Sequence, residues 1–239
     1  MAQHAPQARG ARLGRAAGAN GSVSTVSGVV LLLPGASRLL PGPLRPLARA
    51  LARAGGTDGL VAHTVLHGSG PQEEAAGWAA DEALRRYGDV PVCLAGYGAG
   101  GRAALRAGGH GAVNTVVALA PCLGGAAGDG SPEPVKHLAG RQVLIVHGTN
   151  DARSDPESSF LLAARAKKAN RSTCRFEVHS DGHGLRDHQA EVVALGVDFV
   201  LGSMVSGRYS RPVTDALAAP PPLGLRMPLA SGFGRSLRG

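Results

Sequence analysis

Residues 90–101 read VPVCLAGYGAGG, and they carry the clearest structural signal in this sequence. Its first half, residues 90–95, is a short apolar run typical of a buried strand. Its second half, residues 96–101, has glycine at four of six positions, and the small-residue pattern of residues 99–107 predicts a helix. We therefore expect a strand that turns sharply into a helix, with glycines where the two backbones approach each other closely.

Short apolar runs alternate with helical patterns on both sides of this turn. That alternation predicts a mainly parallel α/β sheet with helices on both faces. Six strands are expected, at residues 29–33, 61–66, 90–95, 115–119, 143–147 and 174–179. Helices are expected at residues 43–54, 72–87, 99–107, 158–170 and 188–201. The resulting domain would occupy residues 28–202.

The two ends of the chain differ from this domain in composition. Residues 1–27 carry three arginines, no acid and no periodicity, and we expect a disordered basic arm. Residues 203–239 are rich in Pro and Gly, and we expect a basic tail along the domain surface. Most of the formal net charge of +8 lies in these ends. The nearly neutral domain, in a chain with 3% aromatic residues, lacks the features of a nucleic-acid-binding surface.

Composition also bears on membranes and on the cellular compartment. No apolar run approaches the roughly 20 residues of a membrane span, so no membrane partner is expected. The three cysteines are an odd number without paired spacing, which favours a reducing, cytoplasmic environment. Arginine outnumbers lysine, and alanine and glycine are abundant, a bias typical of a GC-rich bacterial genome.

The glycines of residues 96–101 also match G-x-G-x-x-G, the fingerprint of a dinucleotide site. Such a site needs an acidic residue about 20 positions later, at the end of the next strand. Residues 116–121 read VVALAP and contain no acid, so no nucleotide cofactor is expected. A metal is not expected either, although five potential ligands crowd together, namely His179, Asp181, His183, Asp187 and His188.

The same turn has the spacing of G-x-S-x-G, the nucleophile elbow of α/β-hydrolases, with glycine in place of the serine. Three further segments match that family. Residues 31–36 (LLLPGA) resemble its oxyanion loop, residues 143–151 (VLIVHGTND) its catalytic-acid loop, and residues 181–185 (DGHGL) its catalytic-histidine loop. The order of the segments is the one that the family uses. Residues 28–202 thus resemble the α/β-hydrolase superfamily, in particular its compact, nearly cap-less members such as dienelactone-hydrolase-like esterases.

The resemblance implies a role for each matching residue. Gly98 occupies the nucleophile position, Asp151 the position of the catalytic acid, and His183 the position of the catalytic histidine. The backbone amides of Ala36 and Ala99 would bind the oxyanion. Because glycine has no hydroxyl, an acyl-enzyme cannot form at position 98.

Two other side chains could replace the missing serine. Cys122 follows the strand at residues 115–119, at the same edge of the sheet as the elbow, and Ser37 lies in the oxyanion-side loop. Cys93 lies within a predicted strand and is expected to be buried. Tyr97 is expected to pack in the core beside the nucleophile position.

Two functions remain open. In the first, His183 activates a water molecule in the space beside Gly98, which gives weak hydrolysis of small, activated ester-like substrates. In the second, the protein is a catalytically inactive hydrolase homologue that binds a small ligand or a protein partner. Residues 121–142 leave little room for a cap, so a shallow, open pocket is expected in either case.

Overall fold

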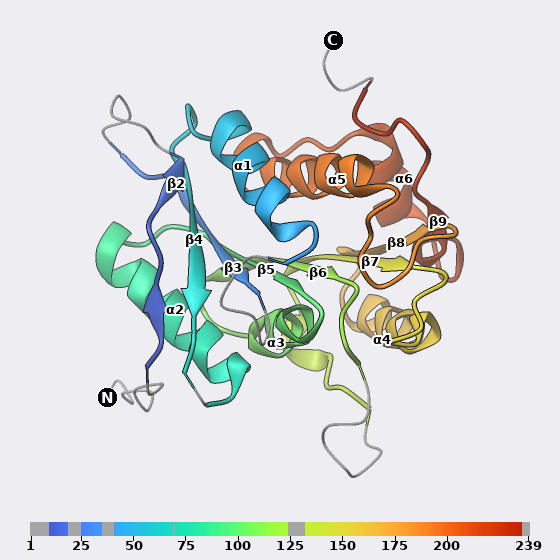
Figure 1. Cartoon of the computed structure of the whole chain (residues 1–239), viewed down its shortest axis with the longest axis horizontal. Helices are drawn as coiled ribbons and strands as arrows, with labels where there is room; N and C mark the ends of the chain where they lie inside the picture. The colour runs from blue at the N-terminus through green and yellow to red at the C-terminus, as the bar shows by residue number, and fades with distance from the viewer. Residues whose placement is uncertain (1–9, 19–24, 35–40, 69, 124–131, 236–239) are drawn as a thin grey trace.

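The computed structural model of the chain describes residues 10–18, 25–34, 41–68, 70–123 and 132–235 (Figure 1). Within these residues nine strands form one sheet, in the order β1-β4-β3-β5-β6-β7-β8-β9, with β2 also paired to β4. The strands are β1 (Arg12–Leu13), β2 (Ala17–Gly18), β3 (Gly28–Leu33), β4 (Leu60–Leu66), β5 (Val92–Tyr97), β6 (Val113–Leu119), β7 (Gln142–Gly148), β8 (Thr173–Val178) and β9 (Met227–Pro228). All neighbouring pairs from β4 to β9 are parallel.

Helices cover both faces of this sheet, as the alternating pattern predicts (Figure 1). One face carries α1 (Leu44–Ala54), α5 (Gln189–Leu201) and α6 (Arg211–Ala218). The other carries α2 (Gln72–Tyr87), α3 (Ala99–Ala107) and α4 (Pro156–Ala169). Short turns complete the chain, the 3-10 helices η1 (Lys136–Leu138) and η3 (Leu223–Leu225) and the π-helical η2 (Gly202–Ser206).

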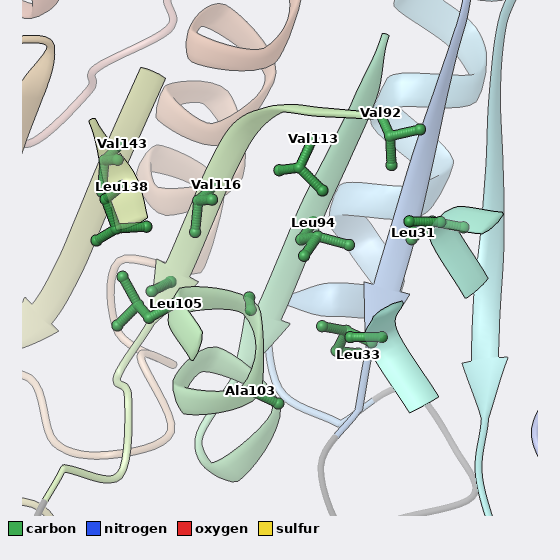
Figure 2. Close-up of a cluster of buried hydrophobic side chains, with 14 of the residues drawn as sticks. Leu31, Leu33, Val92, Leu94, Ala103, Leu105, Val113, Val116, Leu138 and Val143 are labelled. Carbon is green, nitrogen blue, oxygen red and sulfur yellow. The ribbon is translucent and has the colours of Figure 1, made fainter. Parts of the chain in front are cut away.

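The central strands are buried on both faces, which explains their continuous apolar runs. In β3 the side chains of Leu31 and Leu33 face α2 and α3, whereas those of Val30 and Leu32 face α1 and α5. Figure 2 shows the first of these layers, in which Leu94 and its neighbours lie over α3. Alanines on α2 and α3 let these helices lie close to the sheet, which fits the scarcity of aromatic residues.

The prediction of a disordered arm at residues 1–27 is wrong for the part that the structure describes. Arg12 pairs with Leu66 and Ala17 with Ala62, both antiparallel to β4. The carbonyl of Gly14 also contacts the buried ring of His63, whose Nδ1 lies 2.8 Å away. These contacts cover the free edge of β4, which would otherwise expose unpaired backbone groups. Residues 1–9 and 19–24 lie outside the described residues.

The segment after residue 202 is also part of the domain rather than a surface tail. Val213 and Ala216 of α6 are fully buried, and β9 extends the sheet beside β8. The buried ammonium of Lys167 donates hydrogen bonds to three backbone carbonyls, those of Thr173, Ala216 and Leu217. Within the part of the chain that the structure describes, the sheet therefore has nine strands instead of the six expected, because pairings of two residues leave no periodic signal in the sequence.

One stretch, residues Gln189–Ser206 in α5 and η2, is long and apolar enough to cross a membrane by length and composition. In this fold, Val192, Leu195 and Phe199 of that stretch are buried against the sheet and α1. These residues form the buried side of the helix, while 33% of the whole stretch is buried.

Candidate active site

The predicted elbow is present between β5 and α3. Gly98 has φ 58° and ψ −121°, a backbone conformation that side-chain-bearing residues rarely adopt. Its N–H donates to the carbonyl of Leu119 at 3.0 Å, and its carbonyl accepts a hydrogen bond from the N–H of Cys122 at 3.0 Å. These bonds attach the turn to the loop that follows β6. The sequence predicts this strand–turn–helix correctly.

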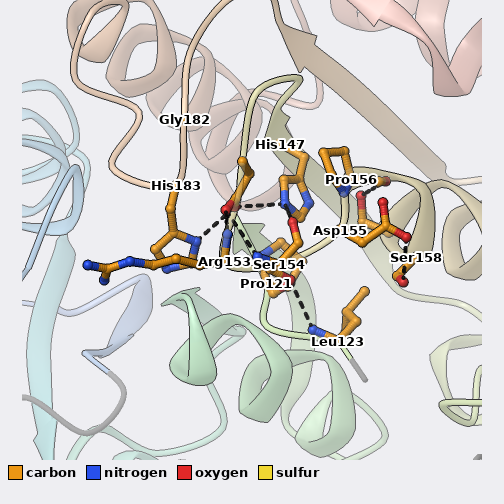
Figure 3. Close-up of polar contacts among 12 residues, drawn as sticks. Pro121, Leu123, His147, Arg153, Ser154, Asp155, Pro156, Ser158, Gly182 and His183 are labelled. Carbon is orange, nitrogen blue, oxygen red and sulfur yellow. Dashed lines mark hydrogen bonds and ion pairs between the residues drawn. The ribbon is translucent and has the colours of Figure 1, made fainter. Parts of the chain in front are cut away.

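An Asp–His pair lies beside the elbow. Asp151 follows β7 and is buried, and its Oδ2 lies 2.8 Å from Nδ1 of His183 (Figure 3). The other carboxylate oxygen, Oδ1, accepts hydrogen bonds from the N–H groups of Arg153 at 2.8 Å and Ser154 at 3.1 Å. Because Asp151 is held on both oxygens, it fixes the orientation of the His183 ring. The structure therefore brings together the two residues that the sequence singles out.

The loop that carries His183 is fixed by its own contacts. Asp181 is buried, and its carboxylate accepts hydrogen bonds from four backbone N–H groups, those of Gly182, Arg186, Asp187 and His188. The hydroxyl of Tyr97 donates to the carbonyl of His183 at 3.0 Å, and the two rings lie 5.2 Å apart between centroids. The Asp181 carboxylate therefore stabilises the conformation of this loop. No group of three metal-ligating side chains is found among the residues that the structure describes.

The imidazole faces the position that a nucleophile would occupy. A Cβ built on Gly98 would lie 3.4 Å from Nε2 of His183 and 3.6 Å from Sγ of Cys122. Ala99 begins α3, and the first N–H groups of a helix have no partner within it. The positive end of the helix dipole therefore points at the same space. The other residues expected near the elbow, Ala36 and Ser37, lie outside the described residues.

A second histidine, His147, also contacts the Asp151 carboxylate, and the sequence does not predict this contact. His147, near the end of β7, is fully buried, and its Nε2 lies 3.0 Å from Oδ2 of Asp151 and 3.1 Å from the carbonyl of Ser154 (Figure 3). Both partners are acceptors, so Nε2 carries the proton, while Nδ1 has no hydrogen-bond partner. The only sequence signal is the position of His147 four residues before Asp151, which does not show that the chain folds back.

The charge state of the carboxylate follows from these contacts. Burial disfavours the charged form of Asp151, but the hydrogen bonds from His183, Arg153 and Ser154 outweigh burial and lower its pKa. Asp151 is therefore ionised at neutral pH and can stabilise a protonated His183 ring. A carboxylate beside an imidazole is the arrangement that supports general-base chemistry.

The buried histidine makes the stability of the fold sensitive to acid. Burial lowers the pKa of His147 from its ordinary 6.5, although the Asp151 carboxylate opposes the shift. The unfolded chain then binds this proton at a higher pH than the folded chain. The stability contributed by neutral His147 is complete above pH 6.5 and is lost as the pH falls below it. We expect the urea concentration at the midpoint of unfolding to decrease when the pH is lowered from 7 to 5.

His147→Gln is the matched variant for this prediction, since its side-chain amide can still donate to Asp151 but does not titrate. The midpoint of this variant should depend less steeply on pH than that of the wild type. The remaining slope includes His63, whose pKa burial also lowers. A slope that is the same in both proteins would contradict the assignment to His147.

Comparison with solved structures gives the wider context of this geometry. Est1E from Butyrivibrio proteoclasticus, solved with ferulic acid, superposes with a TM-score of 0.61 at 16% identity, over 84% of this chain and 98% of that one. A lidless α/β serine hydrolase from Xanthomonas campestris, XC6422, gives 0.62 at 14% identity, over 80% and 88% of the two chains. The chain adopts the α/β-hydrolase fold. The esterase Pf2001 from Pyrococcus furiosus has the same α/β-hydrolase fold, with a TM-score of 0.60 at 15% identity, over 75% and 82%.

No protein-family model and no curated protein matches this sequence. At identities of 14–16%, these structures show the α/β-hydrolase fold alone. The predicted fold class is confirmed by them. The roles expected of Gly98, Asp151 and His183 are therefore argued from the geometry described above.

Proposed function

We propose that the protein hydrolyses small ester-like substrates, with His183 as the general base and Asp151 as the group that orients and stabilises it. This proposal rests on one observation, the orientation of the His183 ring. Its Nε2 faces the space beside Gly98, while its Nδ1 is held by the buried Asp151 carboxylate. A buried carboxylate that only stabilised the loop would not need an imidazole directed at the elbow.

The chemistry follows from the residues around this space. An ester carbonyl lying beside Gly98 would have the N–H of Ala99 and the N-terminus of α3 next to its oxygen. His183 accepts a proton through Nε2 from the attacking group and passes it to the leaving alcohol. Asp151 stabilises the imidazolium formed in between. In the simplest form of this mechanism the attacking group is a water molecule that enters the space left by the missing side chain.

The structural neighbours support this choice of substrate. They include esterases and serine hydrolases, and one of them was solved with ferulic acid. The described loop between β6 and β7 contains only the 3-10 turn η1, which agrees with a site open to small molecules. Residues 124–131 of that loop lie outside the described residues.

A direct test uses nitrophenyl acetate and methyl ferulate as probes. We expect measurable turnover by the wild type and a loss of about a hundredfold or more in His183→Ala, the range typical of general-base removal. His179→Ala is the matched control, because His179 is exposed at the end of β8 and no contact with Asp151 is found for it. Turnover that is equal in His183→Ala and wild type would contradict the proposal.

The absence of a hydroxyl at position 98 favours a second function, the binding of a ligand without turnover. Under this alternative the wild type would show no hydrolysis of either ester. A small ester or carboxylate would nevertheless raise its thermal midpoint, and the shift would shrink when Gly98→Val fills the space beside the His183 ring. That combination of results would replace hydrolysis by ligand binding as the function of the site.

A further inference from the structure

Cys122 is the other side chain beside the space at Gly98. We propose that its thiol is the nucleophile that His183 activates, so that the protein acts through a cysteine contributed by the loop that follows β6. This inference rests on the proposed function, because it names the group that attacks the ester. It changes the mechanism from attack by water to formation of a thioester.

The position of Cys122 is fixed by the elbow itself. Its N–H donates to the carbonyl of Gly98 at 3.0 Å, so its Cα cannot move independently of the turn. The three atoms nearest to a Cβ built on Gly98 are Nε2 of His183, Sγ of Cys122 and Cε1 of His183, at 3.4, 3.6 and 3.9 Å. An atom in this space therefore touches both the base and the thiol. The absence of a side chain at Gly98 is what opens the path between them.

Accessibility separates Cys122 from the other two cysteines. Cys93 in β5 and Cys174 in β8 are fully buried in the core on the face of the sheet that α1, α5 and α6 cover. Burial raises the pKa of Cys174 to about 12 and raises that of Cys93 as well. Cys122 is only partly buried. A reagent that enters the site can reach this thiol and not the other two, which serve as internal controls.

The local charges show how the thiol would be used. Burial and the nearby Asp151 carboxylate raise the pKa of Cys122, while Arg153 and Arg102 partly oppose this shift. The resting thiol is therefore protonated and needs a base, as a serine hydroxyl does. A thiol is still a much stronger acid than a serine hydroxyl, and a thiolate of higher pKa is the stronger nucleophile.

The reaction balances without any further reagent. The Sγ proton passes to Nε2 of His183 through a water molecule in the space beside Gly98, and Sγ forms a bond to the ester carbonyl carbon. The bond from that carbon to the alkoxy oxygen breaks, and the proton on His183 goes to the departing alcohol. Water then attacks the thioester, again giving its proton to His183, and that proton returns to Sγ as the acid leaves.

Acid quenching during turnover of nitrophenyl acetate tests this mechanism on the unaltered protein. We expect intact-mass analysis to show one acetyl group, peptide mapping to place it on Cys122, and neutral hydroxylamine to remove it. Acetylation should be at least about a hundredfold slower in His183→Ala, because a thiol that merely reacted with the reagent would not need the base. Cys93 and Cys174 should remain unmodified.

Cys122→Ala supplies the second readout. It removes one partly exposed sulfur atom, and we expect an unchanged thermal midpoint with a loss of ester turnover of about a hundredfold or more. Turnover retained at the wild-type rate in Cys122→Ala, or no acetyl group on Cys122, would overturn the proposal. Hydrolysis that still depended on His183 in that case would leave the proposed function standing with water as the attacking group.

Discussion

Gly98→Ser is expected to raise ester turnover by at least about a hundredfold over wild type and to make the protein react with a fluorophosphonate probe. The new Cβ fits, since its nearest neighbours would be His183 Nε2 at 3.4 Å and Cys122 Sγ at 3.6 Å. The hydroxyl would then lie beside an imidazole already held by Asp151. Serine hydrolases lose roughly a million-fold in turnover when the serine is removed, so a serine placed directly on the elbow should exceed both attack by water and attack by Cys122, whose path to His183 the new side chain would close.

The same substitution should reduce stability. At φ 58° a side chain is strained, and such strain costs on the order of 1–3 kcal/mol. Gly98→Ala carries the same strain without the hydroxyl, so it should lower the thermal midpoint equally and gain neither activity nor probe labelling. The gain in Gly98→Ser should disappear in the double variant with His183→Ala. If Gly98→Ser folds but is not labelled by the probe, the His183 ring does not lie within reach of the residue 98 side chain in solution.

The elbow, the Asp loop and the His loop could be predicted from the sequence because each has a local signature. The glycines at 96–101 mark a close strand-to-helix approach, and the loops after β7 and β8 place Asp151 and His183 at one edge of a parallel sheet. Residues at the carboxyl ends of parallel strands meet at such an edge. The order and spacing of these segments in the sequence are therefore enough to predict that Gly98, Asp151 and His183 lie close together.

Other features depend on contacts between distant segments and could not be predicted. His147 contacts Asp151 because the chain turns back after β7, and the sequence gives no sign of that turn. The pairings of β1 and β2 with β4, and of β9 with β8, involve two residues each. Strands of that length are stabilised by the edge they cover rather than by their own pattern, so composition alone suggests loose ends.

The largest effect on folding is expected from Gly96→Ala, two residues before the elbow. A Cβ on Gly96 would overlap the carbonyl of Gly100 and lie 2.6 Å from the backbone N of Gly101. These are backbone atoms of α3, where the helix packs directly on β5, and they cannot rotate away. Relief requires α3 to move off the sheet, which would expose the buried layer of Ala103, Ala104 and Leu105.

We expect Gly96→Ala to cost more than about 4 kcal/mol, a large part of the stability of a typical domain. In a chain of this size that corresponds to a fall of roughly 10 °C or more in the thermal midpoint, or to failure to fold. Gly77→Ala is the matched control, because Gly77 lies within α2 and an added Cβ would meet no atom within 4 Å. Its midpoint should rise slightly, since alanine favours a helix by about 0.5–1 kcal/mol over glycine. Equal midpoints for the two variants would show that β5 and α3 are not packed this closely, and the elbow geometry on which the candidate site depends would have to be abandoned.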